Sequence, residues 1–208
     1  MKVLSYKQDK DTQVCVCGVD GAGKKSFVSV FFPKEATCKQ QSSLKISKQT
    51  EKLLAIVILD GVHLQNMEEE DVITQISEMC KRNRGIKISI LFVLNKVDLI
   101  YNRRQNPTLV NDIYTSYQQF FEKIKCHEIK FIAFSYLATK IFHELLSREI
   151  DDDDCDDANM MLAKIGKTFS KHFTPDQMKQ YLISHKNVFK VFSGETLIKR
   201  FIERWKEK

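Results

Sequence analysis

Two continuous apolar runs constrain the fold of this 208-residue chain more than any other feature. They are Leu53–Leu59 (LLAIVIL) and Ile86–Leu94 (IKISILFVL), and both are rich in β-branched residues. A strand with one face in water alternates apolar and polar side chains, whereas a strand covered on both faces is apolar throughout. The runs therefore predict two central strands of a parallel sheet with helices on both faces.

Segments with helical periodicity alternate with the strands. Apolar residues recur at helix spacing in 71–82, for example, and Gly85 follows as a stop signal. We expect strands at 12–18, 53–59, 86–94 and 129–134, a short edge strand at 43–46, and helices at 24–32, 71–82, 109–124 and 137–150. This alternation is typical of an α/β fold with a doubly wound, mostly parallel sheet, in which ligands bind beyond the carboxyl ends of the strands.

Charge divides the chain after residue 150. Residues 151–157 (DDDDCDD) carry six Asp, whereas residues 158–208 carry 11 Lys or Arg against four Asp or Glu. An acidic run beside a basic segment is typical of an exposed linker followed by a separate element. We therefore expect a domain at 1–150, an acidic linker at 151–157 and a C-terminal helical extension at 158–208. Within this extension, helices are expected at 158–173, from Thr174 onward and at 193–205.

The sequence has none of the segments that place a chain in a membrane. No run of 18 apolar residues occurs, and the first 13 residues contain no apolar stretch of signal-peptide length. A myristoylation glycine and a CaaX box are both absent. The six cysteines form no CxxC pair, which favours reduced thiols that fill the core. We expect a cytoplasmic location, with peripheral attachment to an intracellular membrane left open.

A glycine-rich segment, hereafter the glycine loop (Gly18–Lys24, GVDGAGK), joins the first strand to the first helix. It fits the GxxxxGK part of a Walker A phosphate-binding loop. Glycines allow backbone N–H groups to turn toward a phosphate chain, and the helix N-terminus adds positive potential. The alternative is a glycine turn that binds no ligand. The predicted phosphate-binding residues are Gly18, Asp20, Gly21, Ala22, Gly23, Lys24, Lys25 and Ser26, with Lys24 bridging the outer phosphates.

The position after Lys24 departs from the Walker A pattern. The pattern has Ser or Thr there as a Mg²⁺ ligand, but this chain has Lys25, and Ser26 follows one residue later. One residue along a helix is a rotation of about 100°. Ser26 is thus the candidate metal ligand only if the loop shifts its register, and otherwise Mg²⁺ binding is weakened.

The tetrapeptide Asn95-Lys96-Val97-Asp98 follows the strand at 86–94. It resembles the NKxD guanine-recognition motif of Ras-superfamily small GTPases. The resemblance implies that Asp98 accepts hydrogen bonds from guanine, that Lys96 packs along the base, and that Asn95 ties this segment to the glycine loop. A stretch around Ser135 and Tyr136 resembles the SAK-type motif that contacts the guanine oxygen, with 138–140 as a second register. The implied ligand is GTP or GDP.

Residues 53–100 and 128–145 are most similar to Rag-type (Gtr-type) GTPases, although residues after 158 do not resemble the second domain of that family. The resemblance implies a signalling or trafficking protein whose partner is another GTPase-like subunit or an effector. No DxxG motif precedes Asp60, only 28 residues (25–52) remain for both switches, and Thr37 and Thr50 are the only threonines among them. No catalytic Gln is placed, so GTP hydrolysis is expected to be weak or absent.

Two other functions remain open from the sequence. The glycine loop also resembles that of thymidylate kinases, although no arginine-rich lid is visible. Alternatively, the chain is a nucleotide-independent interaction module, a pseudo-GTPase. The basic tail interleaves aromatic and cationic residues, a pattern that suits an acidic partner, lipid headgroups or nucleic acid. We favour docking of its aromatic side chains on the core, and we do not expect nucleic-acid binding. These aromatic residues are Phe189, Phe192, Phe201 and Trp205.

Overall fold

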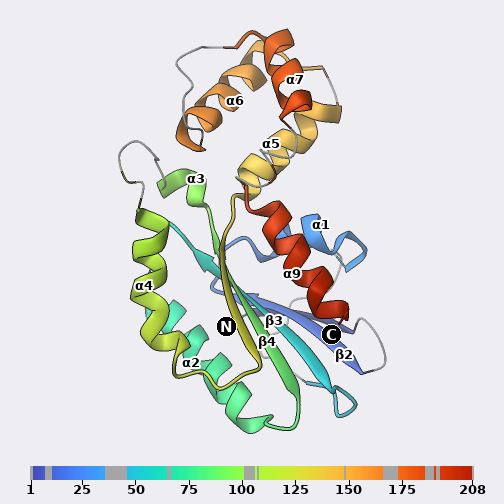
Figure 1. Ribbon diagram of the computed structural model, residues 1–208, viewed down its shortest axis with the longest axis vertical. Helices are drawn as coiled ribbons and strands as arrows, with labels where there is room; N and C mark the ends of the chain where they lie inside the picture. Colours follow the sequence, from blue (N-terminus) through green and yellow to red (C-terminus); the bar gives the residue numbers. More distant parts are fainter. Residues whose placement is uncertain are drawn as a thin grey trace.

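A five-stranded sheet forms the centre of the molecule (Figure 1). The computed structural model describes residues 2–7, 11–35, 46–64, 67–100, 106, 108–147, 149–165, 173–185, 190 and 193–207. The strand order is β1-β2-β3-β4-β5; β1 runs antiparallel to β2, and the other neighbours are parallel. The strands are β1 (Lys2–Lys7), β2 (Thr12–Gly18), β3 (Lys52–Asp60), β4 (Lys87–Asn95) and β5 (Glu128–Ala133).

The predicted central strands are confirmed. In both β3 and β4, every residue after the first is buried, as continuous apolar runs require. Strand β1 was not expected from the sequence; it pairs along β2 and buries Val3 and Leu4. The edge strand expected at 43–46 lies almost wholly outside the described residues, which resume at Ile46.

Helices cover both faces of the sheet, as expected for a doubly wound α/β fold. In Figure 1, α2 and α4 lie on one face, and α1 and α9 lie on the other. Helix α2 begins four residues earlier than predicted because the acidic side chains 68–70 suit the positive N-terminus of a helix. The helices around the sheet are α1 (Lys24–Phe31), a 3-10 turn (Pro33–Glu35), α2 (Met67–Arg82), α3 (Val97–Ile100), α4 (Leu109–Phe121) and α9 (Glu195–Glu207).

Three further helices form a separate buried cluster beyond the carboxyl ends of the strands (Figure 1). They are α5 (Tyr136–Ser147), α6 (Asp152–Ile165) and α7 (Pro175–Ser184). The predicted start of α7 is confirmed, because Thr174 and Gln177 form a capping box. The side chains that make up this cluster are Ala138, Phe142, Leu145, Cys155, Ala158, Met178 and Leu182.

The acidic run is not the linker that we expected from its charge. Residues 152–157 form the first turns of α6, because aspartate side chains stabilise the positive N-terminus of a helix. Cys155 and Ala158 of this helix belong to the buried cluster. Helix α6 therefore begins at Asp152 rather than at 158; it is described to Ile165, and residues 166–172 of the expected helix lie outside the described residues.

The last helix belongs to the core around the sheet. Phe201 and Trp205 are buried in it, and the Lys52 ammonium lies 4.6 Å from the centre of the Trp205 ring. Docking of these aromatic side chains is thus confirmed, whereas Phe189 and Phe192 lie outside the described residues. Two buried clusters, the core around the sheet and the cluster of α5, α6 and α7, divide the chain at other places than the expected boundaries at 150 and 158. The helices α5, α6 and α7 form an insertion between β5 and α9, and α9 returns to the core around the sheet.

Among the described residues, no helix combines the length and apolar character needed to cross a membrane.

Candidate functional site

The glycine loop leaves the carboxyl end of β2 and enters α1, as predicted from the sequence. Gly18 has φ 151°, and a Cβ atom there would lie 2.4 Å from the Ile58 carbonyl oxygen. Gly23 has φ 93°, and its Cβ atom would lie 2.3 Å from the Asn95 Nδ2 atom. Both positions therefore require glycine, one for packing against β3 and the other for the approach of Asn95.

Backbone donors of the glycine loop are available to a ligand. Within the described part of the chain, the N–H groups of Gly21, Gly23, Lys25 and Ser26 have no hydrogen-bond acceptor. They cluster where α1 begins, and such a set of amides at a helix N-terminus binds anions. Asp20 is exposed and Ala22 is buried in the same loop.

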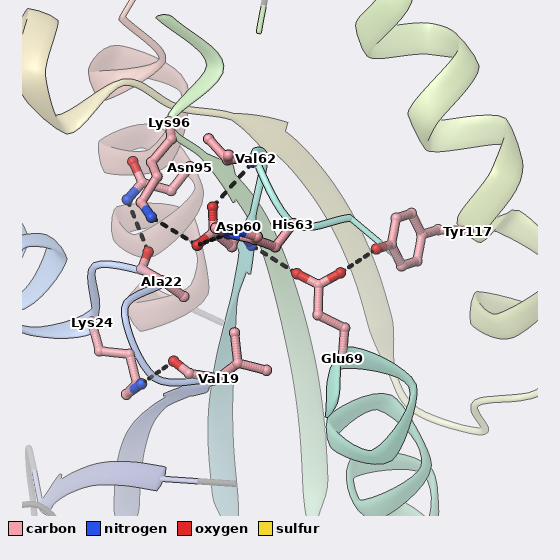
Figure 2. A network of polar contacts seen from close by, with 10 residues as sticks. All are labelled: Val19, Ala22, Lys24, Asp60, Val62, His63, Glu69, Asn95, Lys96 and Tyr117. Carbon is pink, nitrogen blue, oxygen red and sulfur yellow. Dashed lines mark hydrogen bonds and ion pairs between the residues drawn. The ribbon is translucent and has the colours of Figure 1, made fainter. Parts of the chain in front are cut away.

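The Lys24 side chain lies against the loop itself. It is buried, and its ammonium donates a hydrogen bond to the Gly18 carbonyl oxygen at 3.2 Å. It also donates to the Val19 carbonyl oxygen (Figure 2). This arrangement holds a positive charge against the start of the glycine loop. The bridging of outer phosphates that we expected of Lys24 stays a prediction.

Asn95 joins the three motifs that were identified separately in the sequence. Its Nδ2 atom donates to the Ala22 carbonyl oxygen at 2.9 Å, and its Oδ1 atom accepts from the Tyr136 N–H at 3.3 Å. Asn95 is 3% exposed, so both bonds are shielded from water. The contact with Ala22 is the link to the glycine loop that the sequence implied (Figure 2).

The Asp98 carboxylate is held by Ser135. The Ser135 hydroxyl donates to Asp98 Oδ1 at 2.5 Å and accepts from the Ala138 N–H at 3.0 Å. No described residue donates to Asp98 Oδ2. Oδ2 is nevertheless not a fully buried atom without a partner, because Trp205 Nε1 is the one such side-chain atom in the described chain. Asp98 is 3% exposed as a whole, but Oδ2 is not fully buried and is the acceptor of this carboxylate that no described residue occupies.

The Lys96 ammonium contacts a carboxylate of the protein itself, and its packing along a base stays a prediction. Its backbone has φ 61°, and its ammonium forms an ion pair with Asp60 Oδ2 at 2.7 Å. Burial alone would raise the pKa of Asp60, but hydrogen bonds from Lys96, the Val62 N–H and His63 outweigh it and lower that pKa. Asp60 thus holds a negative charge at the carboxyl end of β3, beside the glycine loop (Figure 2).

A buried carboxyl group extends this network to α4. Glu69 accepts a hydrogen bond from the Asp60 N–H at 2.8 Å and another from the Tyr117 hydroxyl at 2.5 Å (Figure 2). Sequence reasoning assigned no role to Asp60 and missed Glu69 and Tyr117. Asp60 had a usable signal, since it ends a buried strand, but Glu69 is one of three consecutive glutamates and Tyr117 lies on a helix of unremarkable composition.

The described residues supply few ligands for a metal ion. Lys25 is exposed and Ser26 is half-buried, and neither side chain makes a hydrogen bond with a described residue. Thr50 donates to Gln13 Oε1 at 3.0 Å at the opposite end of the sheet, and Thr37 lies outside the described chain. No group of three His, Cys, Asp or Glu side chains in the described ranges is placed to bind a metal.

The geometry therefore comprises a group of free N–H groups where α1 begins, a carboxylate held by Ser135, and an amide side chain that links the glycine loop to the segment at Tyr136. In comparisons with known proteins, no protein-family model matches the sequence, and no curated protein matches it significantly.

Proposed function

We propose that this protein binds a guanine nucleotide at the carboxyl edge of its sheet, in the manner of a Ras-superfamily small GTPase. The observation that carries the proposal is the position of Asn95, whose two hydrogen bonds bring the glycine loop and the segment at Tyr136 to the same place. Parallel strands present their carboxyl ends at one edge, which is where α/β folds bind ligands.

The residues present fit such a nucleotide. The free N–H groups at Gly21, Gly23, Lys25 and Ser26 suit phosphate oxygens, and the Lys24 ammonium adds positive charge. The Asp98 carboxylate, oriented by Ser135, suits the two adjacent donors of guanine. Adenine offers an acceptor at one of these positions, so the carboxylate favours guanine over adenine.

We further propose that hydrolysis is slow or absent. Among the described residues, Ser26 is the candidate Mg²⁺ ligand of the loop, whereas Thr50 is bonded to Gln13 and Asp60 is paired with Lys96. None of these groups is positioned to activate a water molecule at the outer phosphate. This set of residues therefore suits a scaffold that holds a nucleotide, or a switch that hydrolyses it slowly.

One observation favours the alternative of a nucleotide-independent module. The ammonium groups of Lys24 and Lys96 are both bonded to protein oxygens, those of Gly18, Val19 and Asp60. Nucleotide binding must offset the loss or rearrangement of these bonds, and if it does not, the fold serves only as an interaction surface.

Titration of fluorescent guanine and adenine nucleotides distinguishes the two. We expect guanine nucleotides to bind more tightly, and we expect Asp98→Asn to shift the preference toward xanthine nucleotides. Asp71→Asn, an exposed aspartate on α2, is the matched control and should keep the guanine preference. Absent or equal binding of guanine and adenine nucleotides would rule out the proposal.

A further inference from the structure

A second pocket lies at the opposite end of the sheet, where β4 and β5 begin. Its volume is about 730 Å³, and it is formed by the last turn of α2, the turn into β4 and the segment before β5. In Figure 1 this is the lower end of the molecule, where α2 connects to β4. Nine residues of β4 separate it from the candidate nucleotide site, a distance of about 26 Å.

The lining of this pocket is strongly basic. Five exposed side chains that carry or can accept a positive charge face it, and no Asp or Glu lines it. None of the five makes an ion pair or a side-chain hydrogen bond with a described residue. The pocket lined by these side chains is hereafter called the basic pocket, and the five are Lys81, Arg84, Lys87, Lys125 and His127.

Backbone donors add to the positive potential. The N–H groups of Arg84 and Gly85, in the turn after α2, have no acceptor in the described part of the chain. Gly85 is exposed, and a Cβ atom there would meet nothing within 4 Å. An anion can therefore approach this backbone closely.

Like charges are crowded at this end of the sheet. Lys52 and Lys87 are register partners on β3 and β4, and burial together with the charge of Lys87 lowers the pKa of Lys52. The charge of Asp11 opposes this effect on Lys52, and two other acidic side chains pair with cations outside the pocket: Glu78 with Arg82 at 2.9 Å, and Glu128 with Arg204 at 2.6 Å. This repulsion costs stability that an anionic ligand would offset.

We propose that the basic pocket binds a multiply phosphorylated ligand, either a soluble polyphosphate or the phosphorylated headgroup of a lipid. A single phosphate cannot contact all the cations that surround a space of this volume, whereas several phosphates on one ring or chain can. The proposal does not depend on the guanine-nucleotide site, because no residue is shared between the two.

Inositol hexakisphosphate and phosphatidylcholine vesicles, with and without phosphatidylinositol bisphosphate, are suitable probes for the full chain. The test variant is Arg84→Glu/Lys125→Glu. The control variant is Lys34→Glu/Arg200→Glu, which makes the same change of net charge at exposed residues outside the pocket. Circular dichroism melting confirms that both variants fold.

We expect the soluble probe to bind, the test variant to bind about tenfold or more weakly, and the control to change little. If the vesicles that contain phosphatidylinositol bisphosphate also bind and the soluble probe displaces them, the ligand of the basic pocket is a lipid headgroup. If these vesicles do not bind, the ligand is a soluble polyphosphate. Equal losses in the two variants would show nonspecific charge attraction and overturn the proposal. Absence of binding to both probes, or vesicle binding that the test variant retains, would also overturn it.

Discussion

Replacement of Tyr117 by Phe tests the polar network that joins α2, α4 and the end of β3. The Tyr117 hydroxyl is buried and donates to Glu69 at 2.5 Å, so the substitution removes one hydrogen bond from a carboxyl group that is 1% exposed. Loss of a buried donor to such a group costs about 2 kcal/mol. For a chain of this length, this loss corresponds to a fall in melting temperature of about 4–8 °C.

The same helix provides the control. Tyr114 is 43% exposed, and its hydroxyl makes no hydrogen bond with a described residue, so Tyr114→Phe should change the free energy of unfolding by less than about 0.5 kcal/mol. Urea titration, monitored by the fluorescence of Trp205, measures the free energy of unfolding of both variants. Trp205 is the single tryptophan and lies in the core around the sheet.

A double-mutant cycle with Glu69→Gln then isolates the pair. We expect a coupling energy of about 1 kcal/mol or more between Tyr117 and Glu69. If Tyr117→Phe is no more destabilising than Tyr114→Phe, or if the two substitutions in the cycle are additive, the buried hydrogen bond does not stabilise the fold as argued.

Three other predictions follow from the site and the core. Asp60→Asn should lower stability by about 1 kcal/mol at pH 7. Because the folded-state pKa of Asp60 lies below its unfolded value of about 4, the difference from wild type should shrink as pH falls below 4, which urea titrations at pH 7 and pH 3 would show. Gly23→Ala should weaken nucleotide binding far more than Gly21→Ala: both positions have positive φ, but only at Gly23 would the new Cβ atom collide with another side chain. Burial raises the pKa of Cys17 to about 12, so iodoacetamide should label this thiol at pH 8 only after denaturation, as judged by peptide mass mapping.

Local features of the sequence were sufficient to predict the centre of the fold. The apolar runs of β3 and β4 need no knowledge of their neighbours, because a strand covered on both faces is apolar at every position. The glycine loop is equally local, since Gly18 and Gly23 mark positions where any other residue would collide. Pattern and composition therefore located β2, β3, β4 and the loop between β2 and α1.

Contacts between distant segments could not be predicted in this way. The acidic run at 151–157 has the charge of a linker, but it is helical because Cys155 and Ala158 pack against α5 and α7. The partner of Lys96 is Asp60, 36 residues earlier, and nothing in either local sequence indicates the pair. Strand β1 likewise depends on its pairing with β2 rather than on its own composition.

Ser135 shows how such long-range contacts shape the candidate site. Its hydroxyl holds Asp98, and its backbone N–H donates to the Ser193 carbonyl oxygen at 3.1 Å, where the chain returns from the helical insertion. Gly194 follows with φ 81°, and a Cβ atom there would lie 2.1 Å from the Ala133 carbonyl oxygen, so the two ends of the insertion are packed tightly together. The residue that orients the Asp98 carboxylate is therefore also the residue from which α5, α6 and α7 depart. The position of these helices and the orientation of Asp98 consequently depend on one another.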